Sequence, residues 1–186
     1  MKKVFLLFVM ISLLSGCAAS DSNIDAAMQM RQKILDADGC SFDCVITADY
    51  GDCICTFSMN CQADRRGKVI FCVTSPQEIS GITGKIDGSG GALTFDDKVL
   101  AFSLLADAQL TPVSAPWLFI HTLQSGYMSA ATHTDNGLWI QIDDSYADDA
   151  LQLDIWTDDE IRPQRCEIVY RGRRILSLDV RNFAYL

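Results

Sequence analysis

Eight cysteines are the residues of this 186-residue chain with the widest choice of chemistry. Cys17 stands near the amino terminus, and the other seven are Cys40, Cys44, Cys53, Cys55, Cys61, Cys72 and Cys166. Seven is an odd number, so at least one of these thiols stays unpaired in a monomer. A cysteine can serve as a metal ligand, as half of a disulfide or as a small apolar core residue.

The pattern of the seven thiols favours packing over metal binding. Cys53, Cys55 and Cys61 recur at every second position around Phe57, which places them on the apolar face of a strand. The Cys-x-Cys spacing is not that of a zinc knuckle, and no second Cys pair or His pair completes a site. We therefore expect no metal and no cofactor. Disulfides are the alternative, with Cys44 to Cys53 across the first hairpin as the best pair.

Few groups are suited to catalysis near neutral pH. The chain has two histidines. His121 lies among apolar residues, as a partly buried helix histidine does, and His133 falls near a turn, where we expect it to be exposed. The acidic run 143–149 lacks the central Gly and terminal Glu of an EF-hand loop, which favours a solvated loop over a calcium site. No Gly-x-Ser-x-Gly motif or phosphate-binding loop occurs, so we predict that the protein is not an enzyme.

The amino terminus has the layout of a secretory signal peptide. Lys2 and Lys3 precede an apolar run over 4–14, and Leu14-Ser15-Gly16-Cys17 follows. That tetrapeptide resembles the bacterial lipobox, which implies that the Cys17 thiol receives a diacylglycerol. We predict a lipoprotein signal peptide over 1–16, a lipidated tether over 17–22 and a single domain over 23–186. An ordinary signal peptide with a chance cysteine is the alternative.

This arrangement predicts an extracytoplasmic protein held on the cell membrane, or on the outer membrane in an organism with two membranes. The formal net charge is −9, and it becomes −11 once Lys2 and Lys3 are removed with the signal peptide. A surface that acidic repels phosphate backbones, so we expect no nucleic-acid partner. Hydrophobic residues make up 49% of the chain and charged residues 21%, as in a globular domain.

The periodicity predicts one helix followed by a long series of strands. Ser22 and Asp25 fit a capping box for a helix over about 23–37, which Gly39 would end. Its apolar face would hold Ile24, Ala27, Met28, Ile34 and Leu35. Alternation with a period of two then predicts strands at 41–48, 53–63, 68–74, 81–86, 91–95, 99–105, 129–134, 138–142, 150–156, 165–171 and 174–185. A second helix, unusually apolar, would begin at Ser114-Ala115-Pro116 and end at Gly126.

The fold class predicted from these elements is mainly β with helices. It is a single open antiparallel half-barrel of about eleven strands, covered by an N-terminal helix and an inserted apolar helix. Two helices would not fill the concave face of such a sheet, so we expect an apolar cavity there. A collapsed core without a cavity is the alternative.

The predicted cavity combines residues of the inserted helix with inward-facing residues of the strands. Three helix residues would form a lid over seven strand residues. The lid would be Trp117, Ile120 and Leu123, and the floor Phe57, Met59, Phe71, Leu153, Ile155, Leu178 and Val180.

Residues 23–186 resemble the outer-membrane lipoprotein carrier and receptor superfamily, which includes lipid-binding lipoproteins of mycobacteria and sporulation or germination lipoproteins of Firmicutes. The resemblance rests on the order of elements and on three stretches, Gly67–Phe71, Thr74–Pro76 and Leu93–Asp96.

Two features of this chain differ from the soluble carriers of that superfamily. Cys72 stands where a polar residue near the lid is common, and Cys17 adds a lipid anchor that those carriers lack.

The resemblance implies a membrane-anchored protein that binds a lipid, an acyl chain or the lipid anchor of another lipoprotein in its concave cavity. Its partners would be the membrane, through lipidated Cys17, and that hydrophobic ligand. The alternative is an envelope or sporulation/germination-associated lipoprotein that acts as a scaffold for a protein partner.

Overall fold

One antiparallel sheet of eleven strands dominates the computed structural model, which describes residues 18–106, 109–147 and 150–186. The predicted signal peptide and Cys17 lie outside the described residues. The elements are α2 (Ala18–Asp36), β1 (Gly39–Asp49), β2 (Ile54–Asp64), β3 (Val69–Ser75), η1 (Gln77–Ile79), β4 (Thr83–Asp87), β5 (Gly90–Phe95), β6 (Lys98–Phe102), β7 (Leu105–Ala106), β8 (Gln109–Leu110), η2 (Pro112–Ser114), α3 (Ala115–Ser125), β9 (Tyr127–Thr134), β10 (Gly137–Asp143), β11 (Gln152–Thr157), β12 (Pro163–Tyr170) and β13 (Arg173–Tyr185).

The predicted fold class is confirmed. Each of the eleven predicted ranges overlaps one strand of the main sheet, because alternating side chains identify a half-buried strand well. The predicted strand at 99–105 is in fact two elements, β6 and the short β7, which pairs with β8 in a separate two-stranded ribbon.

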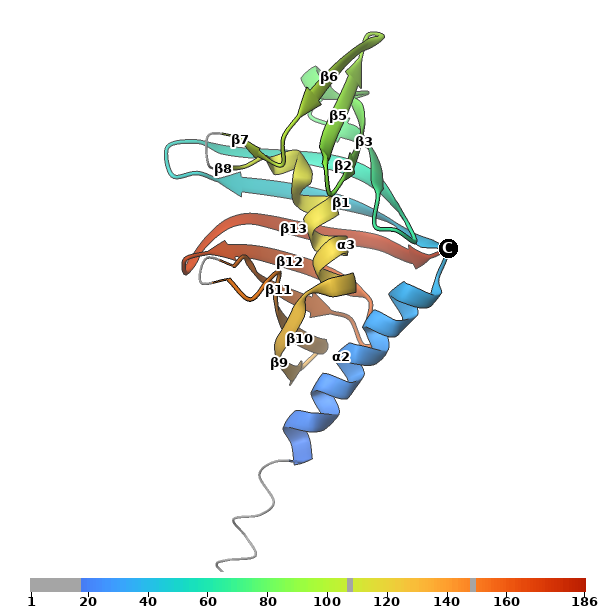
Figure 1. Cartoon of the computed structure of the whole chain (residues 1–186), viewed down its shortest axis with the longest axis vertical. Coiled ribbons are helices and arrows are strands. Elements are labelled where there is room, and N and C mark those ends of the chain that lie inside the picture. Colours follow the sequence, from blue (N-terminus) through green and yellow to red (C-terminus); the bar gives the residue numbers. More distant parts are fainter. Residues whose placement is uncertain (1–17, 107–108, 148–149) are drawn as a thin grey trace, which may run out of the picture.

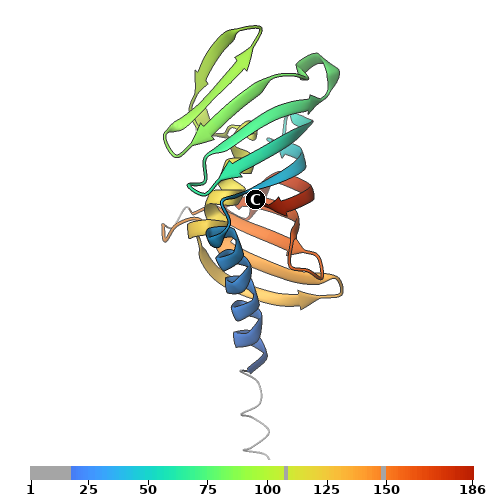
Figure 2. The same cartoon turned by 90° about the vertical axis from the view of Figure 1, so that its right-hand side faces the viewer.

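The order of strands explains how a helix comes to cover the sheet. That order is β6-β5-β4-β3-β2-β1-β13-β12-β11-β10-β9, so the first and last strands of the chain pair at the centre. β6 and β9 form the two opposite edges, yet along the chain β9 is the next strand of the main sheet after β6. The segment between them must therefore travel from one edge to the other. α3 lies in that crossing segment, over the concave face (Figure 1). Figure 2 shows the strands turning continuously from β6 to β9, as right-handed twist requires.

α2 begins earlier than predicted. The helix starts at Ala18, so residues 18–22 of the predicted tether are helical, and Ser22 lies inside the helix instead of capping it. Gly39 does not end the helix either: it opens β1, and a Cβ there would lie 2.2 Å from the carbonyl oxygen of Ala63 on β2. The glycine is needed because the two backbones approach so closely.

The buried face of α2 also differs from the predicted one. Ala27, Met30 and Ile34 are buried, whereas Met28 and Leu35 are exposed. The buried side chains follow one stripe of the helix, which packs mainly against β9 and also touches α3. This packing places the N-terminal helix alongside the inserted one.

Candidate functional site

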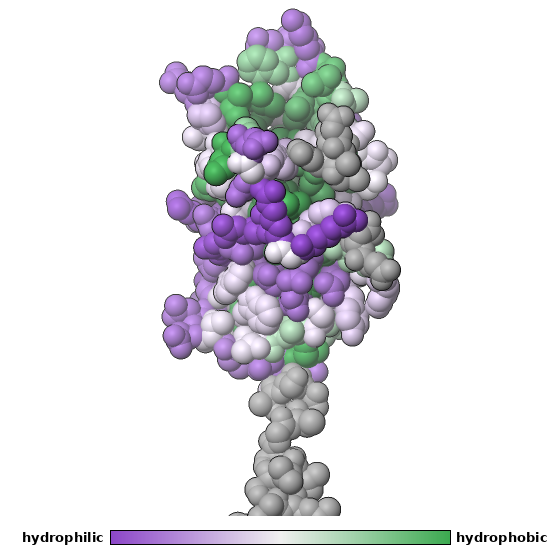
Figure 3. Space-filling model, turned by 90° about the vertical axis from the view of Figure 1, so that its left-hand side faces the viewer, coloured by the Kyte–Doolittle hydropathy of each residue, from purple (hydrophilic) through white to green (hydrophobic). Residues whose placement is uncertain are grey.

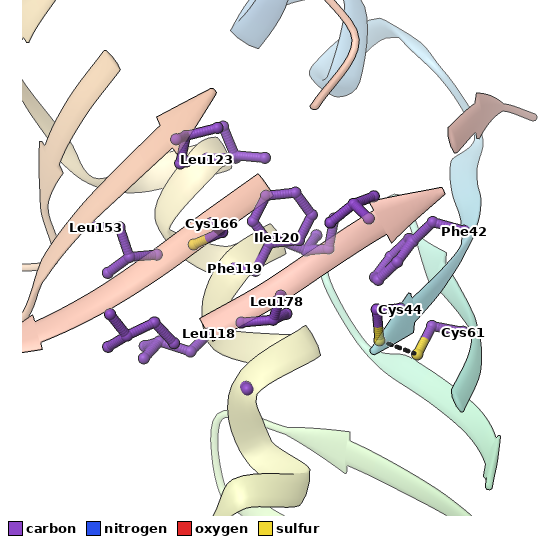
Figure 4. Packing of buried hydrophobic residues seen from close by; sticks show 14 of the residues in the cluster. Phe42, Cys44, Cys61, Leu118, Phe119, Ile120, Leu123, Leu153, Cys166 and Leu178 are labelled. Carbon is purple, nitrogen blue, oxygen red and sulfur yellow. Dashed lines mark hydrogen bonds between the residues drawn. The ribbon is translucent and has the colours of Figure 1, made fainter. Parts of the chain in front are cut away.

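α3 is the element that would have to move for a ligand to enter the concave face. Its residues Leu118, Phe119, Ile120 and Leu123 are all buried, because apolar side chains surround most of the helix. The Phe119 ring meets the Phe42 ring of β1 edge to face, with centroids 5.6 Å apart (Figure 4). α3 is therefore an integral part of the hydrophobic core.

The ten predicted cavity residues lie on α3 and on strands β2, β3, β11 and β13. Nine of them are at most 8% exposed, and all nine belong to one apolar cluster; they are Phe57, Met59, Phe71, Ile120, Leu123, Leu153, Ile155, Leu178 and Val180. The tenth, Trp117, is half-buried and stacks on His121 with ring centroids 4.7 Å apart. The seven strand residues are therefore all buried in the core.

These residues form a filled interior with α3 in this position. Ile120, Leu123 and Leu153 have no exposed surface at all, and the same holds for Ile155 and Leu178. A side chain bordering a space large enough for water would retain some accessible surface, so no such space adjoins these five. A ligand can reach them only after α3 has shifted, and their role toward a ligand stays a prediction.

The apolar concave face continues beyond α3, onto β4, β5 and β6. We call these three strands the extension. Leu93 on β5 lies opposite Gly84 and Leu100, and Gly84 lies opposite the buried Phe71, so Leu93 and Leu100 share the core face. Leu100 is nevertheless 65% exposed. Phe95, two residues after Leu93, faces the same side and is exposed as well.

Hydrophobic side chains gather over this upper part of the molecule, whereas the lower part of the same view is mostly polar (Figure 3). The sequence-based site omitted the residues of the extension. Their signal was present in the alternation of Leu93 with Phe95 and of Leu100 with Phe102. It was missed because alternation alone does not reveal which part of the face the helix leaves uncovered.

A hollow of about 650 Å³ lies on the opposite, outer face of the sheet. Its floor and rim include Asn60, Ile70, Cys72, Lys85 and Val99, side chains of neighbouring strands that the register places on the outer side. Cys72 therefore points away from the face that α3 covers. The predicted concave cavity and this hollow are on different faces.

An arginine from α2 holds the end of α3. The Arg31 guanidinium donates from Nε to the carbonyl oxygen of Leu123 and from Nη2 to that of Gly126, both at 2.7 Å. The last carbonyls of a helix lack intrahelical partners and carry partial negative charge, so a cation there is favourable. Partial burial lowers the pKa of Arg31. We call this contact the Arg31 bridge; it joins residues 92 and 95 positions apart.

The thiols do not form the hairpin disulfide that was the alternative to core packing. Cys40, Cys44, Cys53, Cys55, Cys61, Cys72 and Cys166 are all free. Cys53 is exposed at the β1–β2 turn, contrary to its predicted place on the apolar face, whereas Cys61 is buried as predicted. Cys44 pairs with Met59 in the register, five residues from the end of the hairpin. That separation is about 16 Å along the strand, so Cys44 and Cys53 cannot bond.

The remaining polar candidates show no assembled site. His121 is exposed, contrary to prediction, because it lies on the outer side of α3, and His133 is exposed as predicted. Among the described residues, no three His, Cys, Asp or Glu side chains are grouped as metal ligands. Within the same residues, neither helix has the length and apolar character needed to span a bilayer.

No family model matches this chain, and no curated protein matches it. Solved structures with a similar fold include a LolA superfamily protein from Nitrosomonas europaea, with 11% identity over 86% of this chain and 93% of that one and a TM-score of 0.45. The lipoprotein LppX of Mycobacterium tuberculosis has 12% identity over 88% of this chain and 96% of that one, with a TM-score of 0.43.

A third similar structure is that of the CwlD amidase of Clostridioides difficile in complex with the GerS lipoprotein, with 11% identity over 87% of this chain and 95% of the matched chain and a TM-score of 0.44. The likeness concerns the fold, and function is argued from the residues of this chain.

Proposed function

We propose that this protein is a membrane-anchored, extracytoplasmic lipoprotein that binds the apolar chain of a lipid or of another lipoprotein's anchor on its concave face. The observation that carries the proposal is the uncovered extension of the core face, where Leu100 and Phe95 remain exposed. Burying such side chains against an acyl chain stabilises a complex by about 25 cal/mol per Å² of apolar surface. The first contact is made at the extension.

Deeper binding requires α3 to move. The cluster beneath α3 is apolar throughout, so an acyl chain replaces α3 side chains there with little loss of apolar burial. The Arg31 bridge is the polar contact that must break or shift with the helix. Catalysis plays no part in this function.

The test uses two neighbouring residues of β6 that face opposite sides of the sheet. The full chain, purified in a mild detergent, is exposed to a photoreactive palmitate analogue, and the labelled residues are mapped by mass spectrometry. We expect labelling on β5, β6 and α3. Leu100→Asp should reduce it about tenfold or more, because a carboxylate in contact with an acyl chain costs several kcal/mol.

Val99→Asp is the matched control, since Val99 is 71% exposed on the outer face and Leu100 is 65% exposed on the concave face. The control should keep its labelling. Loss of labelling in the Val99 variant alone would show that the ligand binds in the outer hollow and would refute binding on the concave face. Absence of specific labelling in the unaltered chain would refute lipid binding.

Anchoring is tested separately. Cys17→Ser should release the protein from the membrane and abolish incorporation of radiolabelled fatty acid into the chain. Membrane retention and lipid incorporation in that variant would contradict the predicted anchor without affecting the argument for the concave face.

The exposed edge strand supports a second candidate, a scaffold that binds a protein. β6 pairs only with β5 in the main sheet, and Val99 and Leu100 expose apolar side chains on both of its faces. Such an edge can accept an additional strand from a partner. A stoichiometric protein partner that is lost in both the Val99→Asp and Leu100→Asp variants, with no lipid bound, would favour this function.

A further inference from the structure

Two buried thiols face one another at the centre of the sheet. The Sγ atoms of Cys44 on β1 and Cys61 on β2 are 3.9 Å apart, as in a thiol–thiol hydrogen bond. Both side chains are buried. In Figure 4 they lie side by side, near Phe42 and to one side of α3. In the register Phe42 is opposite Cys61 and Cys44 is opposite Met59, so the two cysteines are diagonal neighbours on adjacent strands.

We propose that Cys44 and Cys61 are a redox modification site, and that they form a cross-strand disulfide when the chain folds under oxidising conditions. A disulfide bond is about 2.05 Å long, so the two sulfurs must approach by about 1.9 Å. Both thiols already point toward each other across neighbouring strands. Diagonal neighbours have Cα atoms about 7–8 Å apart, and a disulfide needs about 4.4–6.8 Å, so the two strands must also move slightly closer as the bond forms.

The other described cysteines are less suited to this reaction. Cys72 lies on the outer face, and Cys166 lies on β12, which β13 separates from β1. Cys53 is exposed and Cys55 is partly buried on one segment of the chain, where a bond between them would not join two strands. Cys40 shares the core face with Cys44, but among the described residues the only recorded thiol–thiol contact is that between Cys44 and Cys61.

The reaction is an exchange with an external disulfide such as oxidised glutathione. The thiolate of one cysteine attacks a sulfur of glutathione disulfide and releases one glutathione thiolate. The second cysteine then attacks the protein sulfur of this mixed disulfide and releases the second glutathione. The two cysteines lose two electrons and two protons, and glutathione disulfide gains those two electrons and two protons and becomes two glutathione molecules.

The reaction should occur before the core closes. The hydrogen bond to Cys44 and burial together raise the pKa of the Cys61 thiol well above its usual range, so little thiolate exists in the folded protein. The oxidant also has no path to two buried sulfurs. Folding in the reduced state should therefore preserve the dithiol, and folding in an oxidising medium should lock it as a disulfide.

The bond would tie together the strands on which α3 packs. It would close a loop of 16 intervening residues, 45–60, next to the contact between Phe42 and Phe119. By restricting the unfolded chain, a loop of this size raises the folding equilibrium constant on the order of 100-fold. The redox state at the time of folding would then determine the stability of β1 and β2, the strands that the bond joins.

The test maps the bond directly in the full chain. The protein is unfolded with reductant and refolded in detergent with either reduced or oxidised glutathione. It is then treated with N-ethylmaleimide in denaturant, so that buried free thiols are exposed and blocked as well. Digestion before aspartate and after aromatic residues separates the cysteines, leaving Cys44 in fragment 43–48 and Cys61 in fragment 58–63. We expect these two fragments to be linked after oxidative refolding and to carry maleimide after reductive refolding.

Three variants sharpen the result. Cys44→Ala and Cys61→Ala should each abolish the linked fragment and the gain in stability, whereas Cys72→Ala should keep both. Maleimide on both Cys44 and Cys61 after oxidative refolding would overturn the proposal, and so would preferential linkage of either one to another cysteine. The mapping of the unaltered chain decides the matter even if a variant fails to fold.

Discussion

Removing the Arg31 bridge should loosen α3 more than any other single change on the surface of α2. In the variant Arg31→Met, the side chain keeps much of its length and its apolar contacts but loses both hydrogen bonds to the end of α3. The carbonyl groups of Leu123 and Gly126 then lose a charged donor. The stability of α3 and of the whole domain should fall together, because α3 forms part of the core.

The expected magnitude follows from the geometry of the contact. A hydrogen bond from a charged group contributes about 1.5–3 kcal/mol, and the lower value applies because Arg31 is half-exposed. Two such bonds contribute about 3 kcal/mol, and ordering the long side chain costs about 1 kcal/mol. The net loss in the free energy of unfolding should be about 2 kcal/mol, or roughly 30-fold in the equilibrium constant.

Two measurements distinguish this bridge from a general charge effect. Urea denaturation gives the loss of stability, and native-state hydrogen exchange should show faster exchange for amides of 115–126 in Arg31→Met. Lys33→Met is the matched control, since Lys33 is exposed on the same helix and carries the same charge. Equal destabilisation of the two variants, or unchanged exchange in α3, would refute the idea that Arg31 holds the helix.

Two further predictions concern other parts of the fold. A Cβ at Gly84 would lie 2.4 Å from the Phe71 ring, so Gly84→Ala should lower the free energy of unfolding by about 1–3 kcal/mol. Gly88→Ala is the control, because the nearest atom to a Cβ there would be 3.8 Å away and stability should not change. Thermal denaturation of both variants checks this. Partial burial acts to raise the pKa of the Asp158 carboxyl, but hydrogen bonds and the charge of Arg162 outweigh it and hold that pKa below its usual range. Asp158 therefore stabilises the fold above the unfolded pKa of about 3.9, and this contribution is lost as the pH falls through the lower folded pKa. Asp158→Asn should lower the free energy of unfolding at pH 7. In urea titrations near pH 2, the variant and the unaltered chain should have the same stability.

The strands and the direction of their side chains follow from the order of residues alone. Leu153 and Ile155 alternate with polar neighbours, and both are buried. The apolar composition of α3 likewise indicated a helix packed on several sides. These features can be predicted from short segments of the sequence, because they depend on spacing within a few residues. Because many segments alternate in the same way, the sequence predicts the eleven-stranded sheet even though the ends of single strands differ from those predicted.

Other features depend on residues that are distant in the chain. Whether the concave face is hollow depends on the fit between α3 and strands on both sides of it, and the fit proved tight at Ile120 and Leu123. The uncovered extension arises because α3 crosses only part of a sheet whose edges are β6 and β9. The Arg31 bridge and the pairing of Cys44 with Cys61 also arise only on folding, because each joins groups that spacing along the chain cannot bring together. Packing volume and long-range contact are properties of the assembled chain, and no local periodicity encodes them.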